Sequence, residues 1–314
     1  MNRSFPPSLA VLALVFAASP AFAEERPKPT PPERPPFEVA KPIEKENFWV
    51  GVFGPTNCSW IDTGDGVLVI DTGATATDAK NLKAEIAKTT KNHPIRWIAM
   101  THAHSDSNDG FPTFLPTEAT ILVNARIAGA VAHQMAQGST KAPNIIGVSD
   151  RIALVAGGRA FEIGVPAGNA HSSFDLYVFD VSTRTVFTGD LVTTDRCPML
   201  SDPDSDLKGW LAALDRLDTL GAEAIVPTRG LARTGVVPEI EKTRRYLASM
   251  LAFLLEKKKQ NAPEARVSGE LAAEQLGDYC PRELNALNAL SVYRRLLSDG
   301  TTRPGSATAK PAAK

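Results

Sequence analysis

The sequence predicts an α+β protein in which two β-sheets pack face to face and helices cover their outer sides. β-Prone segments give way to strand–helix alternation in the first half of the chain, and a second set of the same kind follows. No short tandem repeat runs through the chain. Because each half must bury an apolar sheet face against another layer, two such halves favour a four-layer αββα sandwich.

The elements of the first half follow from local patterns. Short β-prone runs lie between turns of Gly, Pro, Asn and Asp, and the helix that follows places Ala79, Leu82 and Ile86 on one side. The next strand leads directly into two histidines. The expected elements are strands at 48–53, 58–62 and 67–71, a helix at 77–90, strands at 95–100 and 120–123, and a helix at 125–137.

The second half repeats this order. Its first helix carries an apolar stripe that includes Trp210, Leu214 and Leu217, as expected of a helix packed on a sheet. The expected elements are strands at 152–155, 159–163, 176–181 and 185–188, a helix at 207–220, a strand at 224–227, a helix at 239–258, and one or two helices within 269–298.

The two ends of the chain differ in composition from this central part. A basic start, a short apolar run and the motif Ala21-Phe22-Ala23 predict a cleaved export signal. The linker that follows and the C-terminal tail lack the apolar residues that would offset ordering entropy, so we expect both to be disordered. The predicted organisation is a signal peptide at 1–23, a proline-rich linker at 24–42, a main domain at 43–260, a helical extension at 261–300 and a tail at 301–314.

Composition also limits the environment and the partners. A formal net charge of −1 argues against a nucleic-acid binder, which would carry a basic excess. The apolar run of the signal is too short for a permanent span, so we expect no membrane span after cleavage, with a retained anchor as the alternative. The expected protein is periplasmic and acts on a small-molecule substrate. The sequence does not specify its oligomeric state.

The three cysteines are too few for a disulfide framework. Cys58, Cys197 and Cys280 lack the paired spacing of a structural zinc site. One pair could form a disulfide in an oxidising compartment, but the sequence does not identify the pair.

The clearest chemical signal follows the strand at 95–100. His102 and His104 are two residues apart, so their side chains point to the same side in an extended chain. With the carboxylate of Asp106 beside them, they make a plausible divalent-metal site. Two further candidate ligands, His171 and Asp190, lie in a loop between β-prone runs and at the end of an apolar strand. Alone, either would be an ordinary loop or capping residue.

Five segments, in this order along residues 47–258, resemble the motifs of the metallo-β-lactamase superfamily. They are Val69-Ile70-Asp71-Thr72-Gly73, His102-Ala103-His104-Ser105-Asp106, residues 168–171, Thr188-Gly189-Asp190 and Val226-Pro227-Thr228-Arg229-Gly230. The resemblance implies the family's αββα sandwich, with metal at one edge of the two sheets. It further implies that His102, His104 and His171 hold a first metal, that Asp190 bridges two metals, and that Asp106 serves the second.

Two positions depart from the family pattern. Ser107 and Arg229 stand where members with a full two-metal site commonly carry histidines. Because arginine stays protonated, Arg229 cannot be a ligand, and we expect one tightly bound metal with a weak or absent second site. Arg229 could bind a substrate carboxylate or phosphate, or neutralise Asp106 or Asp190 in place of the missing ion; a plain surface arginine is the third reading.

Other residues indicate which subgroup of the superfamily the chain resembles. One large group of true β-lactamases carries cysteine where this chain has Asp190, so β-lactam hydrolysis is not favoured. The run 189–200, with Lys208-Gly209-Trp210 after it, is similar to the exported quinoprotein relay system zinc metallohydrolases.

The resemblance implies a zinc-dependent hydrolase. A water bound at the open position of such a site is acidified to a pKa near ~7, and it would attack an ester, thioester, lactone, amide or phosphoester. Asp106 would orient that water or take its proton. Loops at 55–59, 141–149 and 193–206 are expected to border the substrate.

Two rival functions remain open. A persulfide dioxygenase-like oxidoreductase would hold one Fe²⁺ with His102, His171 and Asp190. A non-catalytic periplasmic metal-binding accessory of a quinoprotein system would explain the departures at Ser107 and Arg229.

Overall fold

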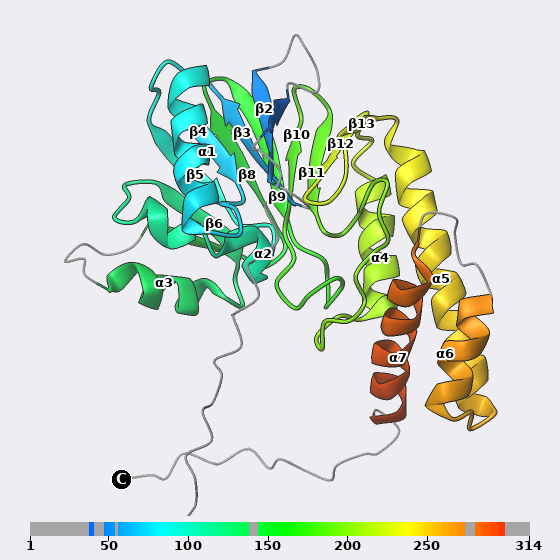
Figure 1. Ribbon diagram of the computed structural model, residues 1–314. Helices are drawn as coiled ribbons and strands as arrows, with labels where there is room; N and C mark the ends of the chain where they lie inside the picture. Colours follow the sequence, from blue (N-terminus) through cyan, green and yellow to red (C-terminus); the bar gives the residue numbers. More distant parts are fainter. Residues whose placement is uncertain (1–37, 41–46, 54–55, 138–143, 274–279, 299–314) are drawn as a thin grey trace, which may run out of the picture. The chain divides into compact units, whose positions relative to one another are not determined.

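Two β-sheets lie face to face in the computed structural model, with helices on their outer sides (Figure 1). The structure describes residues 38–40, 47–53, 56–137, 144–273 and 280–298. The expected signal peptide and C-terminal tail, and most of the expected linker, lie outside these residues. The predicted αββα sandwich is confirmed.

The first sheet has seven strands in sequence order. Strands β1 to β4 pair antiparallel, whereas β4, β5, β6 and β7 run parallel. The strands are β1 (Glu38–Ala40), β2 (Phe48–Phe53), β3 (Thr56–Asp62), β4 (Val67–Ile70), β5 (Ile95–Ala99), β6 (Thr120–Asn124) and β7 (Ile145–Val148).

The second sheet has six strands in the order β13-β12-β11-β10-β9-β8. Only β11 and β12 run parallel; the other pairs within this sheet, all among described residues, are antiparallel. The strands are β8 (Arg151–Ala156), β9 (Arg159–Gly164), β10 (Tyr177–Asp180), β11 (Thr185–Gly189), β12 (Ala224–Pro227) and β13 (Arg233–Thr234).

Alternation along β4 divides its side chains between two cores. Val67 and Val69 belong to the apolar cluster that includes helix residues on the outer side of the first sheet. Leu68 and Ile70 belong to a second cluster, shared with Phe187 and other residues of the facing sheet. Because side chains alternate with a period of two, an all-apolar strand is what burial on both faces requires.

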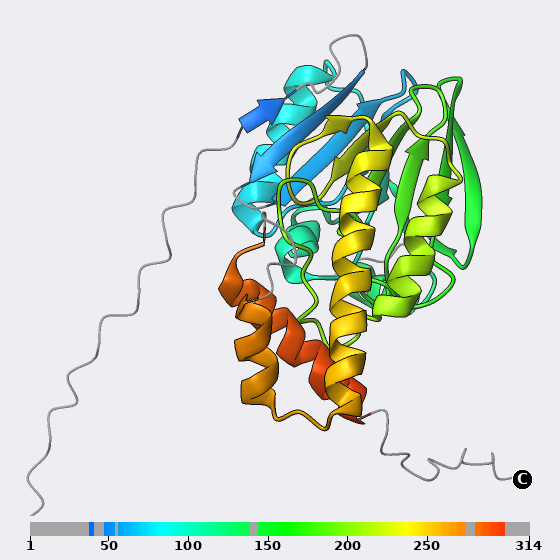
Figure 2. The same ribbon diagram turned by 90° about the vertical axis from the view of Figure 1, so that its right-hand side faces the viewer.

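Helices cover both outer sides. Helix α1 begins after Thr75, whose hydroxyl accepts a hydrogen bond from Asp78 N at 3.1 Å. Helices α1 and α3 pack on the first sheet, and α4 and α5 on the second (Figures 1 and 2). The helices are α1 (Ala76–Thr89), α2 (Ser105–Asn108), α3 (Ala128–Ala136), α4 (Leu207–Asp218), α5 (Val236–Lys259), α6 (Glu264–Ala273) and α7 (Arg282–Ser298), with a 3-10 turn at Phe111–Phe114.

The C-terminal helices α6 and α7 pack against each other, and α7 packs against α5 (Figure 2). Val267 of α6 and Val292 of α7 share one apolar cluster with Trp210 of α4. The hydroxyl of Tyr293 donates to the carbonyl of Ala262 at 2.7 Å. The extension therefore packs on the helices α4 and α5 that cover the second sheet.

Several elements differ from the sequence prediction. Strand β1 lies in the expected linker and pairs with β2, and β7 lies in the expected loop at 141–149. Most of the expected loop at 55–59 belongs to β3. Short strands of this kind gain their stability from a neighbouring strand, which local pattern does not show. No helix among the described residues is both long enough and apolar enough to cross a membrane.

Candidate metal centre

The candidate residues come from loops that leave the ends of central strands. His102 and His104 follow β5, Asp190 follows β11, and Arg229 follows β12. His171 lies in the loop between β9 and β10. Parallel pairing of β4 with β5, and of β11 with β12, brings the carboxyl ends of each pair to one edge of its sheet.

Backbone hydrogen bonds join the two sheets at this edge. The amide of Leu176, just before β10, donates to the carbonyl of Thr101 at 2.7 Å, and the amide of Asn57 donates to the carbonyl of Thr228 at 2.7 Å. The loops of the candidate centre are thus tied to each other by main-chain groups, whose positions do not depend on flexible side chains.

Three histidine rings converge at this edge. The centroids of His102, His104 and His171 lie between 4.9 and 5.1 Å apart, and the rings meet edge to face. One ring nitrogen from each lies within 4.8 Å of the others. Nδ1 of His104 is 3.0 Å from Nε2 of His171, near the roughly 3.3 Å between two ligands of a tetrahedral zinc with ~2.0 Å bonds. The three histidines could therefore hold a metal ion.

The tautomer of His102 suits a ligand. The hydroxyl of Thr101 donates to Asp71 at 2.7 Å, so it accepts from Nδ1 of His102, 2.9 Å away. A proton on Nδ1 leaves the lone pair on Nε2. That Nε2 is buried and has no hydrogen-bond partner among the described residues. A buried nitrogen without a partner is costly, and a bound cation would satisfy it.

The rings are also held neutral. Burial, and then the neighbouring His104, lower the pKa of His171 to about 3. Burial and the two other histidines lower the pKa of His102 well below its usual value. Since metals bind neutral imidazole, this environment fits a metal ion better than a cluster of imidazolium groups.

Asp190 is a buried carboxylate beside the histidines. Its Oδ2 lies 3.5 Å from Nε2 of His171 and 3.8 Å from Nε2 of His102. Its Oδ1 has no hydrogen-bond partner among the described residues. Burial, and then the carboxylate of Asp71, raise the pKa of Asp190. A cation close by favours the ionised form of such a carboxylate.

Arg229 is that cation. Its Nε donates to Asp190 at 2.8 Å, and its Nη2 donates to Asp106. Its side chain is 14% exposed, so the reading as a plain surface arginine is wrong. Gly230 holds the loop in place with φ of +99°, and a Cβ there would lie 1.7 Å from the carbonyl oxygen of Thr194.

Asp106 lies at the outer side of the centre. Its side chain is 40% exposed and pairs with Arg229, and its Oδ1 accepts from the hydroxyl of Ser107 at 3.4 Å. The group of potential ligands consists of the three histidines, whereas Asp106 and Asp190, predicted as further ligands, share the guanidinium of Arg229.

Asp71 is a residue whose part in the centre the sequence analysis missed. Its carboxylate accepts from Thr101 N at 2.8 Å, from Asn108 Nδ2 at 2.8 Å and from the Thr228 hydroxyl at 3.2 Å. It thus links the loop of His102 to the loop of Arg229. Burial raises its pKa to about 6. Its place at a strand end, in Asp71-Thr72-Gly73, was the available signal.

The loop between β11 and α4 lies beside the histidines. Nε1 of Trp210 donates to the carbonyl of Leu191 at 2.7 Å, and its ring lies edge to face with His171 at 5.2 Å. Asp204 Oδ2 accepts from the amide of Ser173, two residues after His171, at 2.7 Å. The expected border loop at 193–206 therefore does lie next to the candidate centre.

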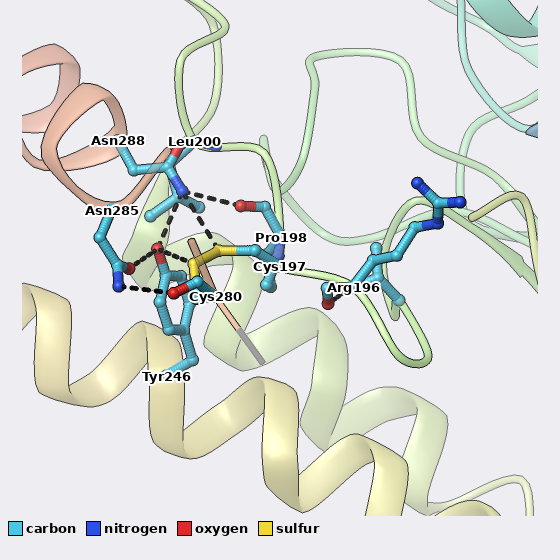
Figure 3. The surroundings of a disulfide bond; sticks show 9 residues. Arg196, Cys197, Pro198, Leu200, Tyr246, Cys280, Asn285 and Asn288 are labelled. Atoms are coloured by element: carbon cyan, nitrogen blue, oxygen red, sulfur yellow. Dashed lines mark hydrogen bonds between the residues drawn. A yellow bond between two sulfur atoms is a disulfide. The ribbon is translucent and has the colours of Figure 1, made fainter. Parts of the chain in front are cut away.

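A disulfide joins this loop to the C-terminal extension. Cys197 bonds to Cys280, the residue pair that the sequence left open (Figure 3). Asn288 of α7 donates to the carbonyl of Pro198 at 2.8 Å and accepts from the amide of Leu200 at 2.9 Å. Cys58 is buried and free, and burial raises the pKa of its thiol. The extension thus holds the loop that borders the histidines.

Family comparison agrees with the fold. The family model described as the metallo-beta-lactamase superfamily matches residues 51–229, more than half of the chain. The chain therefore belongs to the metallo-β-lactamase superfamily, which confirms the family prediction. The finer similarity to quinoprotein relay hydrolases stays a prediction. A search of curated proteins finds no match.

Solved structures share the fold at low sequence identity. A metallo-beta-lactamase from Pontibacter korlensis is 23% identical, with a TM-score of 0.56 over 68% of this chain and 99% of that one. The DIM-1 metallo-beta-lactamase is 16% identical and TMB-1 is 18% identical, each with a TM-score of 0.56 over 69% of this chain and 99% of theirs. At these identities the similarity concerns the fold alone.

Proposed function

We propose that this protein is an exported hydrolase that works with one divalent metal ion, zinc, held by His102, His104 and His171. The observation that carries the proposal is the buried, unpartnered Nε2 of His102, which lies beside two further neutral imidazoles and the carboxylate of Asp190. A zinc ion in such a site acidifies bound water and polarises a carbonyl or phosphoryl oxygen.

The chain's own groups would supply the remaining functions. Asp106 is exposed enough to meet solvent and substrate, and we assign it the role of orienting water and accepting its proton. The Thr101 hydroxyl, fixed by Asp71, keeps the proton of His102 on Nδ1. Substrates would be esters, thioesters, lactones, amides or phosphoesters.

We propose a single ion because Arg229 already neutralises part of the negative charge that would hold a second ion. Asp106 and Asp190 carry two negative charges, and Arg229 supplies one positive charge between them. A second divalent ion would have to displace or lie against this guanidinium, and like charges at contact distance repel by several kcal/mol in a partly buried site, on the order of 4. Arg229 thus favours a single ion.

Export is supported by the disulfide. Disulfides persist in oxidising compartments such as the periplasm and are rare where thiols are kept reduced. The bond between Cys197 and Cys280 therefore supports the proposal that the signal at 1–23 directs the chain to the periplasm. Periplasmic extracts should then contain a mature form whose mass corresponds to a start at Glu24. A mass that retains residues 1–23 would contradict cleavage.

Metal content is the first test. We expect about one zinc per chain by mass spectrometry on protein purified without added metal, and less than a tenth of that in His171→Ala. In a screen of esters, lactones and β-lactams, we expect hydrolysis of an ester or lactone by the zinc form and not after chelation.

Two other outcomes would replace the proposal. One iron per chain, with oxygen consumed in the presence of a glutathione persulfide, would support the oxidoreductase. No metal after zinc is supplied would support a non-catalytic role for the fold.

A further inference from the structure

A cavity of about 480 Å³ lies directly beside the candidate metal centre. Arg229, which pairs with Asp106 and Asp190, forms part of its wall. The other walls come from the hairpin of β2 and β3, the loop after β11, the loop after β12 and the start of α7. Arg229 is therefore the wall residue that the cavity shares with the candidate centre.

Most of the wall is apolar. Val52, Met199, Leu231 and Leu284 contribute aliphatic or thioether side chains. Leu231 is 56% exposed, so its apolar surface is open to a bound molecule. Such a wall favours an apolar body in the ligand, and the cavity has the size of a small-molecule site.

Of the charged side chains that line the cavity, two have ion-pair partners. Asp195 pairs with Arg233 at 2.6 Å, and Arg229 is compensated by two carboxylates. Arg196 also lines the cavity, and within the described part of the chain its guanidinium meets no hydrogen-bond or ion-pair partner. In Figure 3 its side chain extends away from the disulfide, with no interaction drawn to the guanidinium. Arg196 is therefore the charged wall residue whose guanidinium is open to a ligand.

The wall that carries Arg196 is held rigidly. Cys197, the next residue, is bonded to Cys280, which is followed by the wall residue Pro281 (Figure 3). The carbonyl of Arg196 accepts from the hydroxyl of Thr193 at 2.8 Å. Preorganisation of this kind lowers the entropy lost when a ligand binds.

From this geometry we propose that the cavity is the substrate subsite, and that it selects a small organic anion. The anionic group, a carboxylate, pairs with the guanidinium of Arg196. The apolar body lies against Met199, Leu231 and Leu284, and the bond to be cleaved points past Arg229 to the metal centre. This assignment rests on the proposed hydrolase function, and it gives the role of anion recognition to Arg196 in place of Arg229.

Calorimetry with a matched pair of probes tests the subsite without turnover. The probes are 4-phenylbutanoate and 4-phenylbutan-1-ol, which share an apolar body and differ in the charge. We expect the mature protein to bind the acid about tenfold more tightly than the alcohol, as one charge-assisted pair in a partly exposed site would give. In Arg196→Gln this difference disappears.

Two further variants separate the parts of the subsite. Arg151→Gln removes an exposed arginine on β8, at the far edge of the second sheet, and keeps the tenfold preference. Leu231→Ala weakens the binding of the acid and the binding of the alcohol by the same factor, about threefold, because it removes apolar contact alone.

The proposal and the hydrolase function fail in different ways. His171→Ala should abolish metal binding and leave the preference for the acid, since the charge on Arg196 is independent of the metal. Equal binding of acid and alcohol by the unaltered protein, no binding of the acid at millimolar concentration, or an unchanged preference in Arg196→Gln would each overturn the proposed subsite.

Discussion

The two sides of the candidate centre are built differently. On one side, His102, His104 and His171 present neutral nitrogens, and the Nε2 of His102 is buried without a partner in the described structure. On the other side, Asp106 and Asp190 are already paired with Arg229. The first side is prepared for a cation from solution, and the second contains a cation supplied by the chain. This difference between the two sides is the reason that we propose one bound ion.

The largest expected effect is on the histidine side. His102→Ala removes the buried ligand atom and should weaken zinc binding by more than about a hundredfold, measured by competition with a chromophoric chelator. His93→Ala is the matched control, because this exposed ring pairs with Asp62 outside the centre. Equal zinc affinity of His102→Ala and the unaltered protein would show that the three histidines are not a metal site.

The second-largest effect is expected for Asp71, which links the histidine side of the centre to the arginine side. Asp71→Ala removes four hydrogen bonds, two from Thr101 and one each from Asn108 and Thr228, and should lower the free energy of unfolding by about 3 kcal/mol in urea. Because Thr101 would no longer orient His102, zinc affinity should also fall about tenfold. Asp62→Ala, at an exposed pair, should change stability by less than about 1 kcal/mol. An effect no larger than that control would mean that Asp71 does not join the two sides.

A smaller effect is expected from a change on the arginine side. Arg229→His replaces the fixed cation by a neutral ligand beside Asp106 and Asp190, and the metal content should rise from about one zinc per chain to about two. Arg229→Lys, which keeps the charge, should stay near one. If Arg229→His also stays near one when zinc is in excess, the guanidinium is not what limits the site.

The smallest effect on the centre is expected from the disulfide. Cys280→Ser should lower the free energy of unfolding by about 3 kcal/mol, since the bond closes a long segment of chain. It should leave the zinc content unchanged, because the bond contacts neither side of the centre directly. Cys58→Ala, which removes a free thiol, is the control for stability. A loss of zinc in Cys280→Ser would show that the extension also supports the metal ligands.

The local sequence pattern was sufficient to predict most of the helices and strands and the candidate metal ligands. The strand at 95–100 was predicted one residue longer than β5, and the histidines after it were recognised by their spacing and their place at a strand end. The local pattern did not predict β7 or β1, because these strands depend on pairing with β6 and β2. Their sequences carry no signal that is independent of those neighbours.

The sequence by itself determined the strand and helix periods, the order of the family motifs and the residue types able to bind metal, because these depend on neighbours along the chain. Only the tertiary structure decided that Arg229 joins Asp106, 123 residues away, to Asp190, and that Cys197 pairs with Cys280. It also left Arg196, within the described structure, without an ion-pair partner beside a largely apolar cavity. Such pairings form between loops that are far apart in the sequence. The packing of the two sheets decides which of these loops come together at their edge.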